Sequence, residues 1–172
     1  MTVLRKFSPK ARLRVLKSAL FGVSLSLIIL PASAHYNGWK FPPSVRMQEV
    51  SGLNFGTIAP DLHAPGVVRV RANRNGFSRC GHPLLCLESG SRGLFRISSS
   101  RTRFIRIDVS DEAVLTNHLG DQMYVGDFRV RGPRLVRRNR PELIAVGASL
   151  LVGAQQPPGH YRGTYEITIS YE

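Results

Sequence analysis

The stretch YEITISYE, residues 165–172, decides the fold class of this chain. Tyr165, Ile167, Ile169 and Tyr171 alternate with polar side chains. A period of two, carried by β-branched and aromatic residues, is typical of a β-strand with one buried face. The sequence therefore predicts a strand here, with those four side chains pointing towards a core or a groove.

Similar patterns recur upstream, separated by turn residues at fairly regular spacing. About seven short strands predict an antiparallel, immunoglobulin-like β-sandwich, with a small closed barrel as the alternative. Gly126 predicts a β-bulge, residues 72–92 a loop or irregular hairpin, and residues 113–118 at most a short helical turn. The expected strands cover residues 53–56, 66–71, 94–98, 103–109, 123–130, 143–153 and 165–172.

The N-terminal region has the pattern of a secretory signal peptide. Residues 1–17 carry six Lys and Arg and no acid, and an apolar run follows at residues 19–30. Ala32-Ser33-Ala34 then offers small residues to a signal peptidase. We expect cleavage between Ala34 and His35, which removes 34 of 172 residues and leaves 138. The apolar run is too short for a comfortable membrane span, and an uncleaved anchor is the alternative.

The predicted organisation is a signal peptide at 1–34, an irregular N-terminal extension at 35–50 and a β-sandwich domain at 51–172. The extension is the place for a donated β-strand, although Phe41-Pro42-Pro43 is poor strand material. A self-complete sandwich that uses residues 45–58 as its own first strand is the alternative. We expect the mature chain in the periplasm, at the cell surface or secreted, with no stable membrane span.

The predicted mature chain is basic, with 18 Lys and Arg against 11 Asp and Glu. Arginines such as Arg69 and Arg106 alternate with apolar neighbours, which is typical of the solvent face of strands. An arginine-rich surface can instead attract polyanions, such as anionic lipid or acidic glycan. The tightest cluster is Arg137-Arg138-Asn139-Arg140, in an expected loop. We expect no nucleic-acid partner for an exported chain.

Two cysteines, Cys80 and Cys86, bracket five residues of the expected loop. In an exported protein, such a pair predicts one disulfide that closes a small loop. A metal site that adds His82 is the alternative, but two Cys and one His without a fourth ligand nearby form a weak zinc pattern.

Motifs for catalysis are missing from the sequence. It contains no G-x-S-x-G, no H-E-x-x-H and no phosphate-binding glycine loop. Asp108, Asp111 and Glu112 are close together, but their spacing does not match an EF-hand, so we expect a solvated turn. His35, as a new N-terminus, could bind copper through its amine and imidazole, although the other histidines are scattered. We therefore expect no enzyme and no cofactor, with copper binding as a minor alternative.

The ending VGASLLVGAQQPPGHYRGTYEITISYE, residues 146–172, resembles that of a bacterial family of exported domains of unknown function (DUF4402). Residues 53–58 (LNFGTI) and 120–123 (GDQM) also resemble the family, while the cysteine pair and the arginine-rich strands depart from it. The resemblance runs from about Ser51 to the end of the chain.

The same ending is similar to that of subunits of chaperone–usher pili, which carry a penultimate Tyr and a Gly fourteen residues from the end. Tyr171 and Gly159 occupy these positions. The resemblance implies an incomplete sandwich that lacks one strand, with the last strand at the edge of the groove. It implies that a periplasmic chaperone first lends a strand there, and that the next subunit then donates one, a form of β-augmentation.

From this resemblance we expect a non-enzymatic structural subunit of a surface fibre, with a role in cell adhesion. Its expected partners are copies of itself or related subunits, a periplasmic chaperone and an outer-membrane usher. The expected partner-binding residues are Gly159, Tyr165, Ile167, Ile169 and Tyr171. The alternative is a monomeric exported β-sandwich that binds a ligand or an anionic surface.

Overall fold

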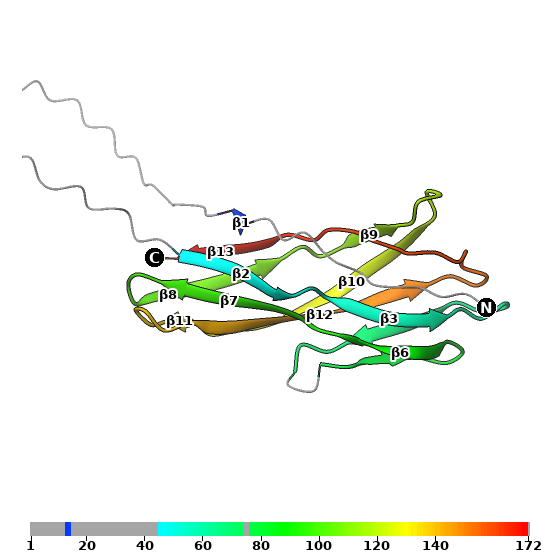
Figure 1. The fold of residues 1–172 in the computed structure, drawn as a ribbon, viewed down its shortest axis with the longest axis horizontal. Helices are drawn as coiled ribbons and strands as arrows, with labels where there is room; N and C mark the ends of the chain where they lie inside the picture. The colour runs from blue at the N-terminus through cyan, green and yellow to red at the C-terminus, as the bar shows by residue number, and fades with distance from the viewer. Residues whose placement is uncertain (1–12, 15–44, 74–75, 172) are drawn as a thin grey trace, which may run out of the picture.

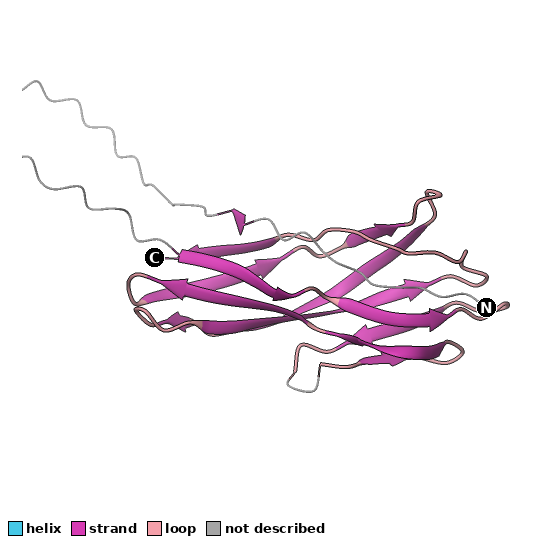
Figure 2. Ribbon diagram, viewed as in Figure 1, coloured by secondary structure: helices cyan, strands magenta, loops and turns pink. Residues whose placement is uncertain are grey.

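The computed structural model describes residues 13–14, 45–73 and 76–171, and every regular element among them is a β-strand (Figure 1, Figure 2). No helix occurs in this described part of the chain. The strands form an antiparallel β-sandwich with one shared hydrophobic core, which confirms the predicted fold class. The predicted cleavage site at Ala34 and His35 lies outside the described residues.

The larger sheet contains seven strands and the smaller one four, and a two-stranded ribbon extends the structure. The larger sheet has the order β2 (Val45–Ser51), β7 (Gly93–Ser99), β12 (Glu142–Val152), β10 (Gln122–Arg131) and β9 (Ala113–Thr116), with β4 (Gly66–Val70) on β12 and β5 (Ser78–Cys80) on β4. The smaller sheet has the order β1 (Leu13–Arg14), β13 (Ile167–Tyr171), β8 (Arg103–Val109) and β11 (Leu135–Val136). The ribbon pairs β3 (Asn54–Ala59) with β6 (Leu85–Ser91).

Two local predictions from the sequence are corrected by the structure, and a third is refined. Residues 45–50 are not irregular, because β2 pairs with β7 over this stretch. Residues 113–116 form the strand β9 rather than a helical turn, since every second side chain there is buried. Residues 72–92, predicted as a loop or an irregular hairpin, contain β5 and β6. These strands pair with β4 and β3 respectively, and the segment closes on itself at an antiparallel bridge between Phe77 and Ser91.

The strand β12 organises the larger sheet. Its first half pairs with β7 and its second half with β4, while β10 runs along its other edge. The change of partner falls at Gly147, where an added β-carbon would lie only 2.3 Å from the carbonyl oxygen of Val70. Glycine is therefore needed at this position so that the two backbones can approach each other.

A β-bulge in β10 keeps the two faces of the sheet chemically distinct. The register shifts between Gly126 and Arg129, and Asp127 adopts a positive φ of 50°. The extra residue reverses the alternation, so that Phe128 points into the core while Arg129 and Tyr124 both point outwards. The bulge predicted from Gly126 is therefore confirmed.

Two buried tyrosines lie just before β13, and each is only 3% exposed. The hydroxyl of Tyr161 donates a hydrogen bond to the carbonyl oxygen of Pro157 at 2.8 Å and accepts one from Nε2 of Gln156 at 2.9 Å. This return to the backbone a few residues upstream is the arrangement of a tyrosine corner, which is typical of immunoglobulin-like sandwiches.

The hydroxyl of Tyr165 has no hydrogen-bond partner among the described residues. Its ring packs edge-on against Phe95, with centroids 6.5 Å apart, and against Phe128 at 5.2 Å. An added β-carbon on Gly93 would lie 2.9 Å from this hydroxyl, so glycine makes room for it. Burial raises the pKa of Tyr165 well above its ordinary value.

The two tyrosines form a matched pair for substitution. We expect Tyr161→Phe to lower the free energy of unfolding by about 1–3 kcal/mol, because it breaks two hydrogen bonds and leaves the carbonyl oxygen of Pro157 without this donor. Tyr165→Phe removes an unsatisfied polar atom, so we expect stability to be unchanged or raised by about 1 kcal/mol. Urea denaturation of both variants measures the two changes in the free energy of unfolding. Equal losses of stability would contradict the assignment of a hydrogen-bonded hydroxyl to Tyr161 and an unsatisfied one to Tyr165.

Alkaline pH tests the same site independently. A folded-state pKa above the unfolded value means that the unfolded chain releases the Tyr165 proton first, so the stability that this group contributes falls as pH rises above about 10. We expect Tyr165→Phe to lose less stability than the wild type between pH 9 and pH 11 (roughly one unit on either side of the ordinary tyrosine pKa). Urea midpoints measured across this range for the wild type and the variant test this expectation. The two curves of midpoint against pH would be parallel if Tyr165 ionised equally in the folded and unfolded states.

Candidate functional site

The strand β13 contains three of the five predicted partner-binding residues, Ile167, Ile169 and Tyr171, and Tyr165 lies two residues before it. Ile167 and Ile169 are completely buried, whereas Thr168 and Ser170 on the opposite face are half-buried. The strand pairs antiparallel with β8, with Ile169 opposite Ile107. Ser110 holds the segment that leads into β13, because its hydroxyl accepts a hydrogen bond from the backbone N–H of Glu166 at 2.7 Å. The predicted inward direction of the apolar side chains is therefore what the structure shows.

The outer edge of β13 is the distinctive feature of this site. It pairs, in parallel, with the two residues of β1, Leu13 opposite Ile167 and Arg14 opposite Thr168 (Figure 1). Both residues of β1 belong to the predicted signal peptide. No other strand of the described residues pairs with this edge. Without β1, β13 would be an edge strand that borders the core.

Tyr171 closes the strand and is half-buried. Its ring lies beneath the guanidinium of Arg103 on β8, whose central carbon is 5.9 Å from the ring centroid. A cation over an aromatic face at this distance is an attractive contact. The last residue of β13 is thus held to its neighbour by a side-chain contact as well as by the strand pairing.

Gly159 lies outside the β13 edge. An added β-carbon there would lie 3.2 Å from Nδ2 of Asn117, a buried residue that organises the turn between β9 and β10. The Asn117 side chain accepts hydrogen bonds from the backbone N–H groups of Leu119 and Asp121, both at 2.9 Å. The structure therefore gives Gly159 a packing role in the path that leads to β13.

The segment between Gly159 and β13 follows the free edge of β9. Thr116 and Arg162 exchange two backbone hydrogen bonds, of 2.8 and 3.0 Å. An added β-carbon on Gly163 would lie 2.2 Å from the carbonyl oxygen of Val114. The chain thus covers the edge of the larger sheet before it enters the smaller one as β13.

Cys80 and Cys86 form the predicted disulfide, with their Cα atoms 5.8 Å apart. Cys80 ends β5, which pairs with β4 of the larger sheet, and Cys86 lies in β6, which pairs with β3. The disulfide therefore fastens the two-stranded ribbon to the larger sheet.

The other residues singled out from the sequence are spread over separate strands and loops in the described part of the chain. No group of three His, Cys, Asp or Glu side chains able to hold a metal ion occurs among the described residues. His35 of the copper hypothesis lies outside them. Asp108 forms an exposed ion pair with Arg106 at 3.1 Å. Arg138 of the arginine-rich loop donates its backbone N–H to the hydroxyl of Thr102 at 3.1 Å, so this loop rests on the turn before β8.

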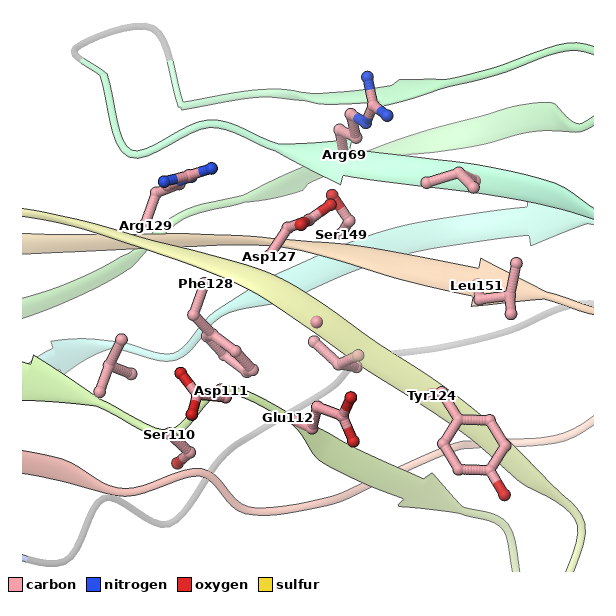
Figure 3. Close-up of a pocket in the computed structure, with 14 residues that line it drawn as sticks. Arg69, Ser110, Asp111, Glu112, Tyr124, Asp127, Phe128, Arg129, Ser149 and Leu151 are labelled. Atoms are coloured by element: carbon pink, nitrogen blue, oxygen red, sulfur yellow. The ribbon is translucent and has the colours of Figure 1, made fainter.

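A second surface, which the sequence did not single out, lies on the outer face of the larger sheet. Figure 3 shows Arg69 of β4 and Arg129 of β10 near Ser149 and Asp127, with Tyr124 further along β10. These residues line a hollow of about 660 Å³. The sequence does contain a signal for it, since Arg-Val-Arg occurs at both 69–71 and 129–131. Only the pairing of both segments with β12 brings the two motifs together.

Within the described residues, no helix is long and apolar enough to cross a membrane.

The comparison with known proteins adds one finding to this geometry. No curated protein and no solved structure matched the chain. The family model of the domain of unknown function DUF4402 matches residues 45–171, from the first residue of β2 to the last residue of β13. The matched region thus coincides with the described sandwich, and the chain belongs to the DUF4402 family.

Proposed function

We propose that this chain is a non-enzymatic exported subunit that resembles a pilin and assembles into a surface fibre by β-strand complementation at the outer edge of β13. One observation carries the proposal. The only strand of the described residues that pairs with this edge is β1, Leu13–Arg14, which belongs to the predicted signal peptide. Signal cleavage would remove β1 and leave the edge open to a strand from another molecule.

An open edge beside buried side chains favours a strand as the partner. Unpaired backbone N–H and C=O groups of an edge strand are a template for pairing with another chain. A donated strand would satisfy them, and its alternate side chains would pack beside Ile167, Ile169 and Tyr171. A periplasmic chaperone that lends a strand would protect the edge before assembly, and an outer-membrane usher would then support subunit exchange.

On this proposal, a donated strand would have to come from a part of the chain that is not already paired within its own sandwich. Residues 45–51 already form β2, paired with β7, so they are committed to their own sandwich. The remaining candidate is residues 35–44. Ten residues of extended chain span about 33 Å, and a five-residue strand such as β13 needs only about 17 Å. Pro42 and Pro43 lack backbone N–H groups, so they suit a linker to β2 better than a paired strand.

Export of the full chain to a periplasm, followed by purification, tests this function. N-terminal sequencing should first show cleavage between Ala34 and His35. We expect the mature protein to form multimers that survive SDS without heating and dissociate on boiling, because each subunit completes its neighbour. A variant that lacks residues 35–44 should remain incomplete, and a peptide of residues 35–44 should bind to it and raise its melting temperature.

A peptide with the same ten residues in scrambled order is the control, since it keeps the composition and changes only the pattern. Size-exclusion chromatography with light scattering provides the second measurement. The proposal is wrong if the intact mature protein and the truncated variant are both monomers with the same cooperative melt and neither binds the peptide. That outcome would favour a self-complete sandwich that acts as a monomer.

A further inference from the structure

Five arginines gather on the outer face of the larger sheet, and we name this group the arginine face. Four of them line one hollow of about 610 Å³, and an adjoining hollow of about 410 Å³ shares two of these and adds the fifth together with His82. All five side chains are exposed. The members of the arginine face are Arg69, Arg71, Arg79, Arg129 and Arg131.

The strand pairing explains why these side chains converge. Arg69 lies opposite Ser149 of β12 on one side and opposite Arg79 of β5 on the other. Arg129 lies opposite Gly147, on the other edge of β12. Between the two rows of arginines, β12 contributes only small residues to the hollow, Ala148 and Ser149. Long side chains on both sides of a floor of small ones form a trough.

The positive charge of this trough is largely uncompensated. Asp127 is the only acid that lines the hollow with four arginines, and no ion pair joins the five arginines to an acid within the described residues. Asp111 and Glu112, just before β9, lie on the other side of β10 (Figure 3) and line the adjoining hollow of about 660 Å³ together with Asp127. The excess of positive charge therefore belongs to the two smaller hollows, to which Arg71, Arg79 and Arg131 contribute. Arginine guanidinium groups pair with carboxylates and sulfates through two parallel hydrogen bonds, so such a trough favours an anionic ligand.

An apolar row crosses the sheet next to the arginines. Val114, Tyr124, Leu151 and Val67 lie directly opposite one another on four neighbouring strands. The side chain of Tyr124 is 57% exposed and that of Leu151 is 48% exposed. Both line the same hollow as Arg69, which places an aromatic platform beside the cationic trough. Tyrosine presents an apolar ring and a polar hydroxyl, a combination suited to a ligand with both kinds of surface.

We infer that the arginine face binds an acidic polysaccharide, a polymer of sugar rings that carry carboxylate or sulfate groups. The charged groups would pair with the guanidinium groups of the trough, and the C–H faces of neighbouring rings would pack on Tyr124 and Leu151. This site does not depend on assembly at β13, because it lies on a different sheet. Its contacts with the ligand would be the same on a fibre subunit and on a monomer.

Two other polyanions fit the surface less well. A bilayer is flat, so it would contact the ends of the exposed arginine side chains but could not enter the trough between them. Single-stranded nucleic acids are usually held by several aromatic side chains on which successive bases stack. Here the exposed aromatic side chain beside the trough is Tyr124 alone among the residues that line these hollows. A flexible chain of charged sugars can enter the trough and use both surfaces.

Binding to alginate, dextran sulfate and neutral dextran tests the inference, with the full chain exported and purified in its mature form. We expect the two acidic polymers to bind and dextran not to bind. The double variant R129A/R131A should weaken binding by roughly tenfold or more, because it removes charge-assisted hydrogen bonds. Asp127→Asn should tighten binding, since Asn also tolerates the positive φ at this bulge and the competing charge is lost.

The matched control is R137A/R140A, which removes the same charge from exposed positions in the loop at residues 137–140, where neither side chain lines any of the three hollows. We expect less than a twofold loss from it (well under 1 kcal/mol). Equal losses in the two double variants would overturn the inference, because net charge alone would then explain binding. Tighter binding to a single-stranded DNA oligonucleotide or to phosphatidylglycerol vesicles than to either acidic polysaccharide would also overturn it. Circular dichroism and melting temperature confirm that each variant is folded.

Discussion

The close approach of two backbones at Gly147 is the constraint on which the larger sheet depends. There β12 exchanges β7 for β4 as its hydrogen-bonded neighbour, and a side chain at this position would collide with the backbone at residues 70–72. Because β12 is paired along both edges, its inward side chains can be fully buried, as Ile144, Val146 and Leu150 are. A substitution at Gly147 would therefore act on both neighbouring strands and on the core beneath them.

The bulge in β10 couples the core to the surface. One extra residue at Asp127 places Phe128 against the ring of Tyr165 and turns Arg129 outwards beside Arg69. Without the bulge, the alternation after Gly126 would continue in the other phase, with the arginines directed inwards and Phe128 exposed. The same backbone irregularity thus supports hydrophobic packing on one side and the cationic trough on the other.

The sequence predicts this fold best where alternation is strict. The terminal strand and the strand around residues 66–70 follow from their period of two, and the disulfide follows from the spacing of Cys80 and Cys86. Short strands such as β5 and β9 were missed, because three or four residues contain too little periodicity to distinguish a strand from a turn. Their conformation depends on the neighbours with which they pair, and pairing partners are not visible in a local pattern.

The arginine face was missed for a related reason. Each Arg-Val-Arg segment taken alone is explained by ordinary exposure of alternate residues, and this explanation is correct as far as it goes. The added information is that β4 and β10 lie on opposite edges of β12, so that two segments about sixty residues apart in the sequence share one trough. Function on such a surface is a property of strand order, which only the three-dimensional structure supplies.

The two proposed surfaces are compatible because they lie on different sheets. A strand added at β13 would extend the smaller sheet, whereas the trough lies on the outer face of the larger one. In a fibre assembled through β13, each subunit would present its own trough, so that one polysaccharide chain could engage several subunits at once. Linked sites of this kind bind far more tightly than each site alone. A weak trough on a single subunit would therefore be enough to hold an acidic polymer on an assembled fibre.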